Sequence, residues 1–203
     1  MVTIKICGLT REQDIDAVNI ALPDYIGFVF AESRRRIDEE KAKTLKACLD
    51  PSVKAVGVFV NEKIKNIVKL CRDGVIDLVQ LHGDENREYI NELKNEIANK
   101  IIKAIRVKDA SDIEKGMELS CDYLLLDAYH EGSYGGTGKT FDRSLIPVMD
   151  KPFFIAGGIH CGNMEQAVKE CRPYGIDVSS SVETNGYKDP KKIKEIVAKA
   201  REL

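Results

Sequence analysis

Strand and helix patterns alternate eight times along this 203-residue chain, and this alternation limits the folds open to it. Eight short apolar runs, most of them rich in β-branched or aromatic residues, have the composition of buried parallel strands. The predicted strands cover residues 2–7, 25–30, 53–60, 76–81, 101–105, 122–127, 152–156 and 176–179. The predicted helices cover residues 11–20, 38–48, 62–72, 86–97, 110–119, 141–149, 163–171 and 190–202.

Such alternation predicts a parallel sheet with helices packed outside it. Eight units favour closure of the sheet into a barrel, and an open doubly wound sheet is the alternative. The sequence has no linker and no low-complexity segment, and its length suits one hydrophobic core. We therefore predict an α/β protein with a single domain over residues 1–203, a (β/α)₈ TIM barrel.

Composition excludes several classes of partner. The 31 basic and 33 acidic residues give a net charge of −2, so there is no basic field for nucleic acid and no polybasic membrane signal. No apolar run approaches the roughly 20 residues that span a bilayer. The first residues enter a strand directly, unlike a signal peptide. The six cysteines form no CxxC pair, which indicates free thiols in a reducing cytoplasm.

Polar residues end several predicted strands, where a (β/α)₈ barrel keeps its active site. Cys7 ends the first strand just before a predicted helix start, whose dipole would lower the pKa of its thiol. A buried, inert thiol is the alternative. Asp127 ends the sixth strand, where a desolvated carboxyl group can act as a general acid. The alternative is an aspartate bonded to loop amides.

Two loops near the C-terminus fit a phosphate group. Gly157 and Gly158 follow the seventh strand, and Ser180 and Ser181 follow the eighth, where backbone amides can point at an anion. An ordinary tight turn is the alternative for the glycine pair. We therefore predict a small phosphorylated substrate.

Residues 128–140 form the longest irregular stretch, and a loop of that length is usually functional. Its glycines do not make a P-loop, because Ser133 stands where the motif requires glycine. Gly135, Gly136 and Gly138 instead suggest a lid that shields the site from water, or a surface loop.

Three further features bear on chemistry. One member of the Arg34–Arg36 run could clamp a substrate carboxylate, and a solvated charged face is the alternative. His82 follows the fourth strand as a hydrogen-bond donor or a loop residue, and a nucleophilic pair with Cys7 stays open. The three histidines have no metal-binding spacing, so we predict neither a metal site nor a cofactor.

Eight motifs, spread over essentially the whole chain, resemble those of the phosphoribosylanthranilate isomerase family. They are KICGLT (5–10), GFVF with Ser33-Arg34-Arg35 (27–35), GVFVNE (57–62), VQLHGDE (79–85), LLLDA (124–128), YGGTGKTFD (134–142), AGGI (156–159) and DVSSSVE (177–183). The resemblance implies a metal-independent (β/α)₈ enzyme of tryptophan biosynthesis. Its reaction is the Amadori rearrangement of N-(5-phosphoribosyl)anthranilate to 1-(2-carboxyphenylamino)-1-deoxyribulose 5-phosphate.

The resemblance also implies roles for individual residues. Asp127 would be the general acid, Cys7 the general base, and Arg35 the partner of the anthranilate carboxylate. Amides around Gly158 and Ser180 would bind the phosphate. His82 and Asp177 fall on motif positions near the site, in supporting roles.

One position departs from the family pattern, since Ser181 stands where glycine is usual. If that glycine has positive φ, serine is strained by roughly 1 kcal/mol. The rivals to the isomerase reading are another phosphosugar barrel, a Cys-His hydrolase, and a binding barrel that has lost turnover. Monomer and homodimer both stay open.

Overall fold

The computed structural model describes residues 2–128 and 143–203 of the chain. The predicted lid glycines, Gly135, Gly136 and Gly138, lie outside the described residues. No helix within the described ranges is long and apolar enough to cross a bilayer.

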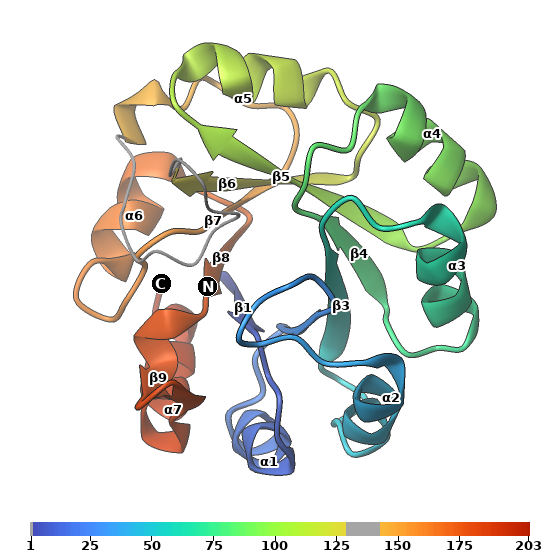
Figure 1. Ribbon diagram of the computed structural model, residues 1–203. Coiled ribbons are helices and arrows are strands. Elements are labelled where there is room, and N and C mark those ends of the chain that lie inside the picture. The colour runs from blue at the N-terminus through green and yellow to red at the C-terminus, as the bar shows by residue number, and fades with distance from the viewer. Residues whose placement is uncertain (1, 129–142) are drawn as a thin grey trace.

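Eight parallel strands close into a barrel, each paired with the next along the chain (Figure 1). They are β1 Thr3–Cys7, β2 Tyr25–Val29, β3 Lys54–Phe59, β4 Leu78–Leu81, β5 Lys100–Val107, β6 Tyr123–Ala128, β7 Phe153–Ile155 and β8 Gly175–Val178. Closure comes from β1 pairing with β8, with Lys5 opposite Asp177. The predicted barrel is confirmed, and the open sheet is wrong.

Helices surround the barrel in Figure 1. They are α1 Glu12–Ala21, α2 Glu39–Ala47, α3 Ile64–Arg72, α4 Arg87–Glu96, α5 Ala110–Met117, α6 Met164–Cys171 and α7 Pro190–Arg201. The helix predicted over residues 141–149 is wrong, because its described part holds only a 3₁₀ turn, η1 Arg143–Leu145. Pro147 explains the difference, since it has no N–H and disfavours helical backbone at Ile146.

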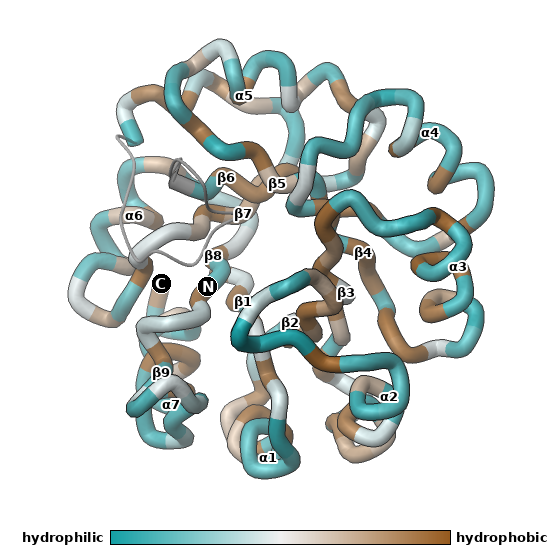
Figure 2. The backbone as a smooth tube through the Cα atoms, viewed as in Figure 1, coloured by the Kyte–Doolittle hydropathy of each residue, from teal (hydrophilic) through white to brown (hydrophobic). Residues whose placement is uncertain are grey.

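Side chains alternate between the two faces of each strand, so the barrel has two apolar layers. On β1, Ile4 and Ile6 belong to the larger core between strands and helices. A second cluster, which includes Val56, Ile102 and Phe154, fills the space inside the strands. Figure 2 shows hydrophobic colour along much of the strands and hydrophilic colour along much of the helices and loops.

Lys5 and Cys7 have the opposite parity on β1 to the outward-facing isoleucines, so both point into the barrel. The fold thereby places a lysine and a thiol on one face of one strand. Cys7 is the last residue of β1, and it lines a pocket at the mouth of the barrel.

Candidate active site

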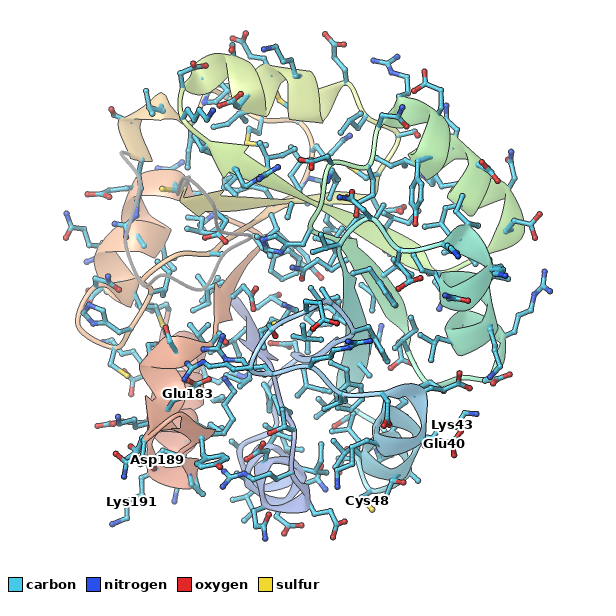
Figure 3. The ribbon with its side chains drawn as sticks, in the orientation of Figure 1. Glu40, Lys43, Cys48, Glu183, Asp189 and Lys191 are labelled. Atoms are coloured by element: carbon cyan, nitrogen blue, oxygen red, sulfur yellow. The ribbon has the colours of Figure 1, made fainter. Side chains whose placement is uncertain are left out.

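One pocket gathers residues from the C-terminal ends of β1, β2, β3, β4, β6, β7 and β8 and the loops after them. Nine of the residues singled out from the sequence line this pocket. They are Cys7, Arg35, His82, Asp127, Gly157, Gly158, Asp177, Ser180 and Ser181. The barrel topology brings them together, because all parallel strands end at the same mouth. Figure 3 shows how densely side chains fill the centre of the ring of strands.

Cys7 lies at the pocket wall with its sulfur packed against the backbone of β2. A Cβ at Gly27 would lie 2.7 Å from the Cys7 Sγ atom, so glycine makes room for the thiol. Burial raises the pKa of the Cys7 thiol, while the charge of Lys5 opposes that rise. The predicted lowering of this pKa by a helix start is wrong, because burial outweighs the nearby positive charges that would lower it.

Asp127 is 5% exposed near the end of β6 and faces a histidine. The Asp127 Oδ2 atom lies 3.5 Å from His82 Nε2. The other ring nitrogen of His82, Nδ1, lies 2.9 Å from Gln80 Nε2. With Gln80 donating, the neutral ring carries its proton on Nε2, which is directed toward Asp127. The sequence analysis gave Gln80 no role, although it lies two residues before His82 on the same face of the strand.

Asp177 on β8 bonds to a lysine that the sequence analysis also missed. Lys5 Nζ donates to Asp177 Oδ2 over 3.0 Å, and Lys5 is wholly buried. The signal was available, because a lysine in an otherwise apolar strand two residues before Cys7 must point the same way as the thiol.

The loops after the adjacent strands β7 and β8 both line the pocket at the predicted phosphate position. Gly157 and Gly158 have φ of 79° and 63°, a region that favours glycine. Asn163 Nδ2 donates to the Gly158 carbonyl over 2.9 Å and fixes the turn before α6. After β8 the chain forms a 3₁₀ turn, η2 Ser180–Val182.

Ser181 is not strained. It lies inside η2 and is absent from the residues with positive φ, so the expected cost of replacing glycine is wrong. Its buried Oγ atom has no hydrogen-bond partner. A buried hydroxyl without a partner is costly, so this atom is suited to meet a ligand.

Arg35 is held by a residue to which the sequence analysis assigned no role. Glu183, labelled in Figure 3, belongs to the short hairpin β9 Glu183–Thr184 and β10 Tyr187–Lys188. Its carboxylate accepts from Arg35 Nε at 2.7 Å and Nη2 at 3.2 Å, and from Lys188 Nζ at 2.9 Å. Burial alone would raise the pKa of Glu183, but the hydrogen bonds and charges of Arg35 and Lys188 lower it to about 2.

We expect Glu183→Gln to destabilise the protein in a pH-dependent way. The folded carboxyl has a lower pKa than an unfolded one, so its contribution is complete above about pH 4.5 and fades as pH falls toward 2. Urea unfolding should therefore separate wild type and variant by roughly 1–3 kcal/mol at pH 6, and the gap should narrow below pH 4. Exposed Glu118→Gln is the control. A gap that stays constant from pH 6 to pH 3 would contradict this account.

Four buried side-chain atoms of the described residues lack a hydrogen-bond partner, and all four belong to residues that line the pocket. They are Gln80 Oε1, His82 Nε2, Asp177 Oδ1 and Ser181 Oγ. Native proteins leave few such atoms, so their concentration here marks a place for a polar ligand. Among the described residues, no group of three or more His, Cys, Asp or Glu side chains could hold a metal ion.

Comparisons with known proteins agree on one family. Residues 4–199 match the model described as N-(5'phosphoribosyl)anthranilate (PRA) isomerase. A relative of that name from Endomicrobium trichonymphae is 50% identical over 203 residues, covering all of both chains. The phosphoribosyl anthranilate isomerase of Thermotoga maritima shares 35% identity with a TM-score of 0.88, covering all of both chains.

A second similar structure contains a ligand. It is a phosphoribosyl anthranilate isomerase in complex with reduced 1-(o-carboxyphenylamino)-1-deoxyribulose 5-phosphate, 32% identical with a TM-score of 0.82 over all of both chains. The Thermotoga maritima protein is described as dimeric.

Proposed function

The chain belongs to the N-(5'-phosphoribosyl)anthranilate isomerase family, and on that basis we propose how its own residues carry out the family's reaction. N-(5-phosphoribosyl)anthranilate becomes 1-(2-carboxyphenylamino)-1-deoxyribulose 5-phosphate, a step of L-tryptophan biosynthesis. The observation that carries the proposal is that a thiol and a carboxyl group, Cys7 and Asp127, line one pocket from β1 and β6.

Asp127 acts first, as the general acid. Its proton goes to the furanose ring oxygen, the bond from that oxygen to C1′ breaks, and the nitrogen lone pair forms an iminium ion with C1′. His82 and Gln80 hold the carboxyl group in place through the chain of contacts described above. General acid–base steps of this kind typically contribute 10²–10⁴-fold to rate.

Cys7 acts second, as the general base. Its thiolate takes the proton from C2′, and the electrons of that C–H bond form the C1′–C2′ double bond and neutralise the iminium nitrogen. The resulting enolamine then tautomerises to the ketose. Neither step changes the oxidation state of a cofactor or requires a metal, in keeping with the sequence analysis.

Binding falls to the remaining pocket residues. Arg35 pairs with the anthranilate carboxylate while Glu183 keeps its guanidinium group in position. His82 and Asp177 supply polar contacts to the sugar, supported by their unpartnered buried atoms. Backbone amides of Gly157, Gly158, Ser180 and Ser181 take the phosphate.

Ser181 adds a side-chain donor to that phosphate site. We expect Ser181→Ala to weaken binding of the phosphorylated product by roughly 0.5–3 kcal/mol, the range for losing one hydrogen bond to a charged group. Ser181→Gly, which restores the usual family residue, should weaken it similarly and should not raise stability. Calorimetric titration of product measures both, with exposed Ser52→Ala as the control. Unchanged affinity in Ser181→Ala would remove the hydroxyl from the site.

A Cys-His hydrolase is the rival that the pocket could most nearly serve. The ring nitrogens of His82 are directed to Gln80 and Asp127, so the histidine is not arranged to activate Cys7. The isomerase is tested by mixing the protein with N-(5-phosphoribosyl)anthranilate and following the loss of anthranilate fluorescence. No loss at micromolar enzyme would overturn the proposed function.

The wider setting belongs to the same proposal. The enzyme is one domain over residues 1–203, works in the cytoplasm as a monomer or homodimer, and binds its small phosphorylated substrate without nucleic acid or membrane. The net charge of −2 supports the exclusion of nucleic acid.

A further inference from the structure

An ion pair lies inside the barrel beneath Cys7, and the mechanism above gives its lysine no role. Lys5 is 0% exposed, and its Nζ atom meets Asp177 Oδ2 at 3.0 Å across the junction of β1 and β8. Burying two charges carries a large desolvation cost, and packed apolar residues often serve stability equally well. The pair therefore calls for an explanation beyond stability.

Its position offers that explanation. Lys5 and Cys7 are two residues apart on β1, so their side chains project from the same face with Cα atoms roughly 6.7 Å apart. The Cys7 thiol and Asp177 both line the pocket, and the charge and a hydrogen bond of Lys5 both act on that thiol. Among the groups that lower the pKa of the half-buried Cys7 thiol, Lys5 has the largest effect.

Only one of the two carboxylate oxygens of Asp177 has a hydrogen-bond partner. Asp177 uses one carboxylate oxygen for Lys5, and its other oxygen has no partner. Burial alone would lower the pKa of Lys5, but the charge of Asp177 and its hydrogen bond raise it. Asp177 thus keeps the lysine protonated at a depth where a lone lysine would lose its proton.

The other charged groups around Cys7 pair with groups other than the thiol. Lys188 of β10 meets Glu183 Oε1 at 2.9 Å and the Ser179 carbonyl at 2.9 Å. Arg35, which packs over Gly8, also meets Glu183. His82 and Asp127 face Cys7 from other walls of the pocket, where they contact each other.

We propose that Lys5 is a positioning residue that stabilises the Cys7 thiolate, and that Asp177 keeps Lys5 charged for this purpose. The inference rests on the proposed role of Cys7 as base. When the thiolate takes the C2′ proton, Cys7 loses its negative charge, the iminium nitrogen loses its positive charge, and Lys5 retains its proton throughout. The lysine therefore favours the form of Cys7 that can accept the proton.

The test measures the thiol directly in resting protein, without turnover. The other five cysteines are first replaced by alanine, because Cys48, labelled at the surface in Figure 3, and Cys161 are exposed and would react. Alkylation of Cys7 by uncharged iodoacetamide is then followed from pH 6 to pH 11 in this background and with Lys5→Met added. We expect the Lys5→Met profile to move to higher pH, with alkylation at least ten-fold slower at pH 8.

Lys103→Met is the matched control. Lys103 is another buried lysine, and it lies on β5. Its Nζ atom pairs with Glu85 Oε2 at 2.8 Å, and the residue does not line the pocket that holds Cys7. Its loss should leave the alkylation profile of Cys7 unchanged. Local opening of the barrel would expose the thiol and speed alkylation, which is opposite to the effect expected of Lys5→Met.

Asp177→Asn is the second variant, and it keeps the lysine. Removing the carboxylate leaves the buried lysine without the charge that keeps it protonated, so the alkylation profile of Cys7 should move to higher pH, as in Lys5→Met. The proposal is overturned if the alkylation profile of Lys5→Met is unchanged or moves to lower pH. It is also overturned if Lys103→Met shifts the profile as much as Lys5→Met does. If Lys5→Met does not fold, an alkylation profile of Asp177→Asn that is unchanged or moved to lower pH overturns the proposal. Failure of the proposed function is separate, since it would appear as full activity in Cys7→Ala.

Discussion

Asp127→Asn is expected to lower kcat by roughly 10²–10⁴-fold while leaving the affinity for product nearly unchanged. The amide has almost the shape of the carboxyl group, but it has no acidic proton to give to the ring oxygen. Asp127 is buried at the pocket wall, with its Oδ2 atom 3.5 Å from His82 Nε2. The amide of the variant can occupy the same place, so the pocket should stay intact. Fluorescence-based turnover and calorimetric titration of product measure the two quantities.

The same substitution at the other end of the same strand provides the control. Asp122 precedes β6 and accepts a hydrogen bond from the Ile101 amide at 2.9 Å, far along the strand from the pocket. Asp122→Asn should lose some stability and keep kcat within a few-fold of wild type. If Asp127→Asn retains near-wild-type kcat, Asp127 is not the acid.

Much of the fold could be predicted because local patterns and topology agree. Eight apolar runs separated by helical patterns leave few arrangements other than a closed barrel, and closure then brings every strand end to one mouth. The prediction failed over residues 141–149, where the apolar spacing looked helical and Pro147 prevented it. A single proline removes both a hydrogen bond and the helical conformation before it.

The site was less predictable where it depends on contacts between distant segments. Cys7 and Asp127 could be found because each ends a strand, and strand ends converge. Glu183 could not be given a role, because nothing in the sequence shows that a hairpin after β8 returns to hold Arg35. The pKa of Cys7 was predicted in the wrong direction, since burial depends on the packing of β2 and β8 around the thiol.

The conformation of Ser181 shows the same limit. A departure from a family pattern suggested a strained backbone, but whether φ is positive depends on the turn that the chain adopts. In η2 the backbone is ordinary, and the feature that matters is a buried hydroxyl without a partner. The departure therefore changes the expected chemistry of the phosphate site and not its stability.

Cys7→Ser is expected to reduce kcat/KM by roughly 10²–10⁴-fold, because a hydroxyl group cannot form the anion that accepts the C2′ proton near neutral pH. Burial raises the pKa of the wild-type thiol, so the thiolate fraction of Cys7 should rise about ten-fold per pH unit while pH stays below that pKa. Fluorescence-based turnover at neutral pH measures the loss of kcat/KM in Cys7→Ser. Cys121→Ser is the control, since Cys121 is 6% exposed and lies before β6, away from the pocket. It should lose stability and keep kcat/KM within a few-fold of wild type. A Cys7→Ser enzyme with the wild-type kcat/KM would show that another group removes the proton.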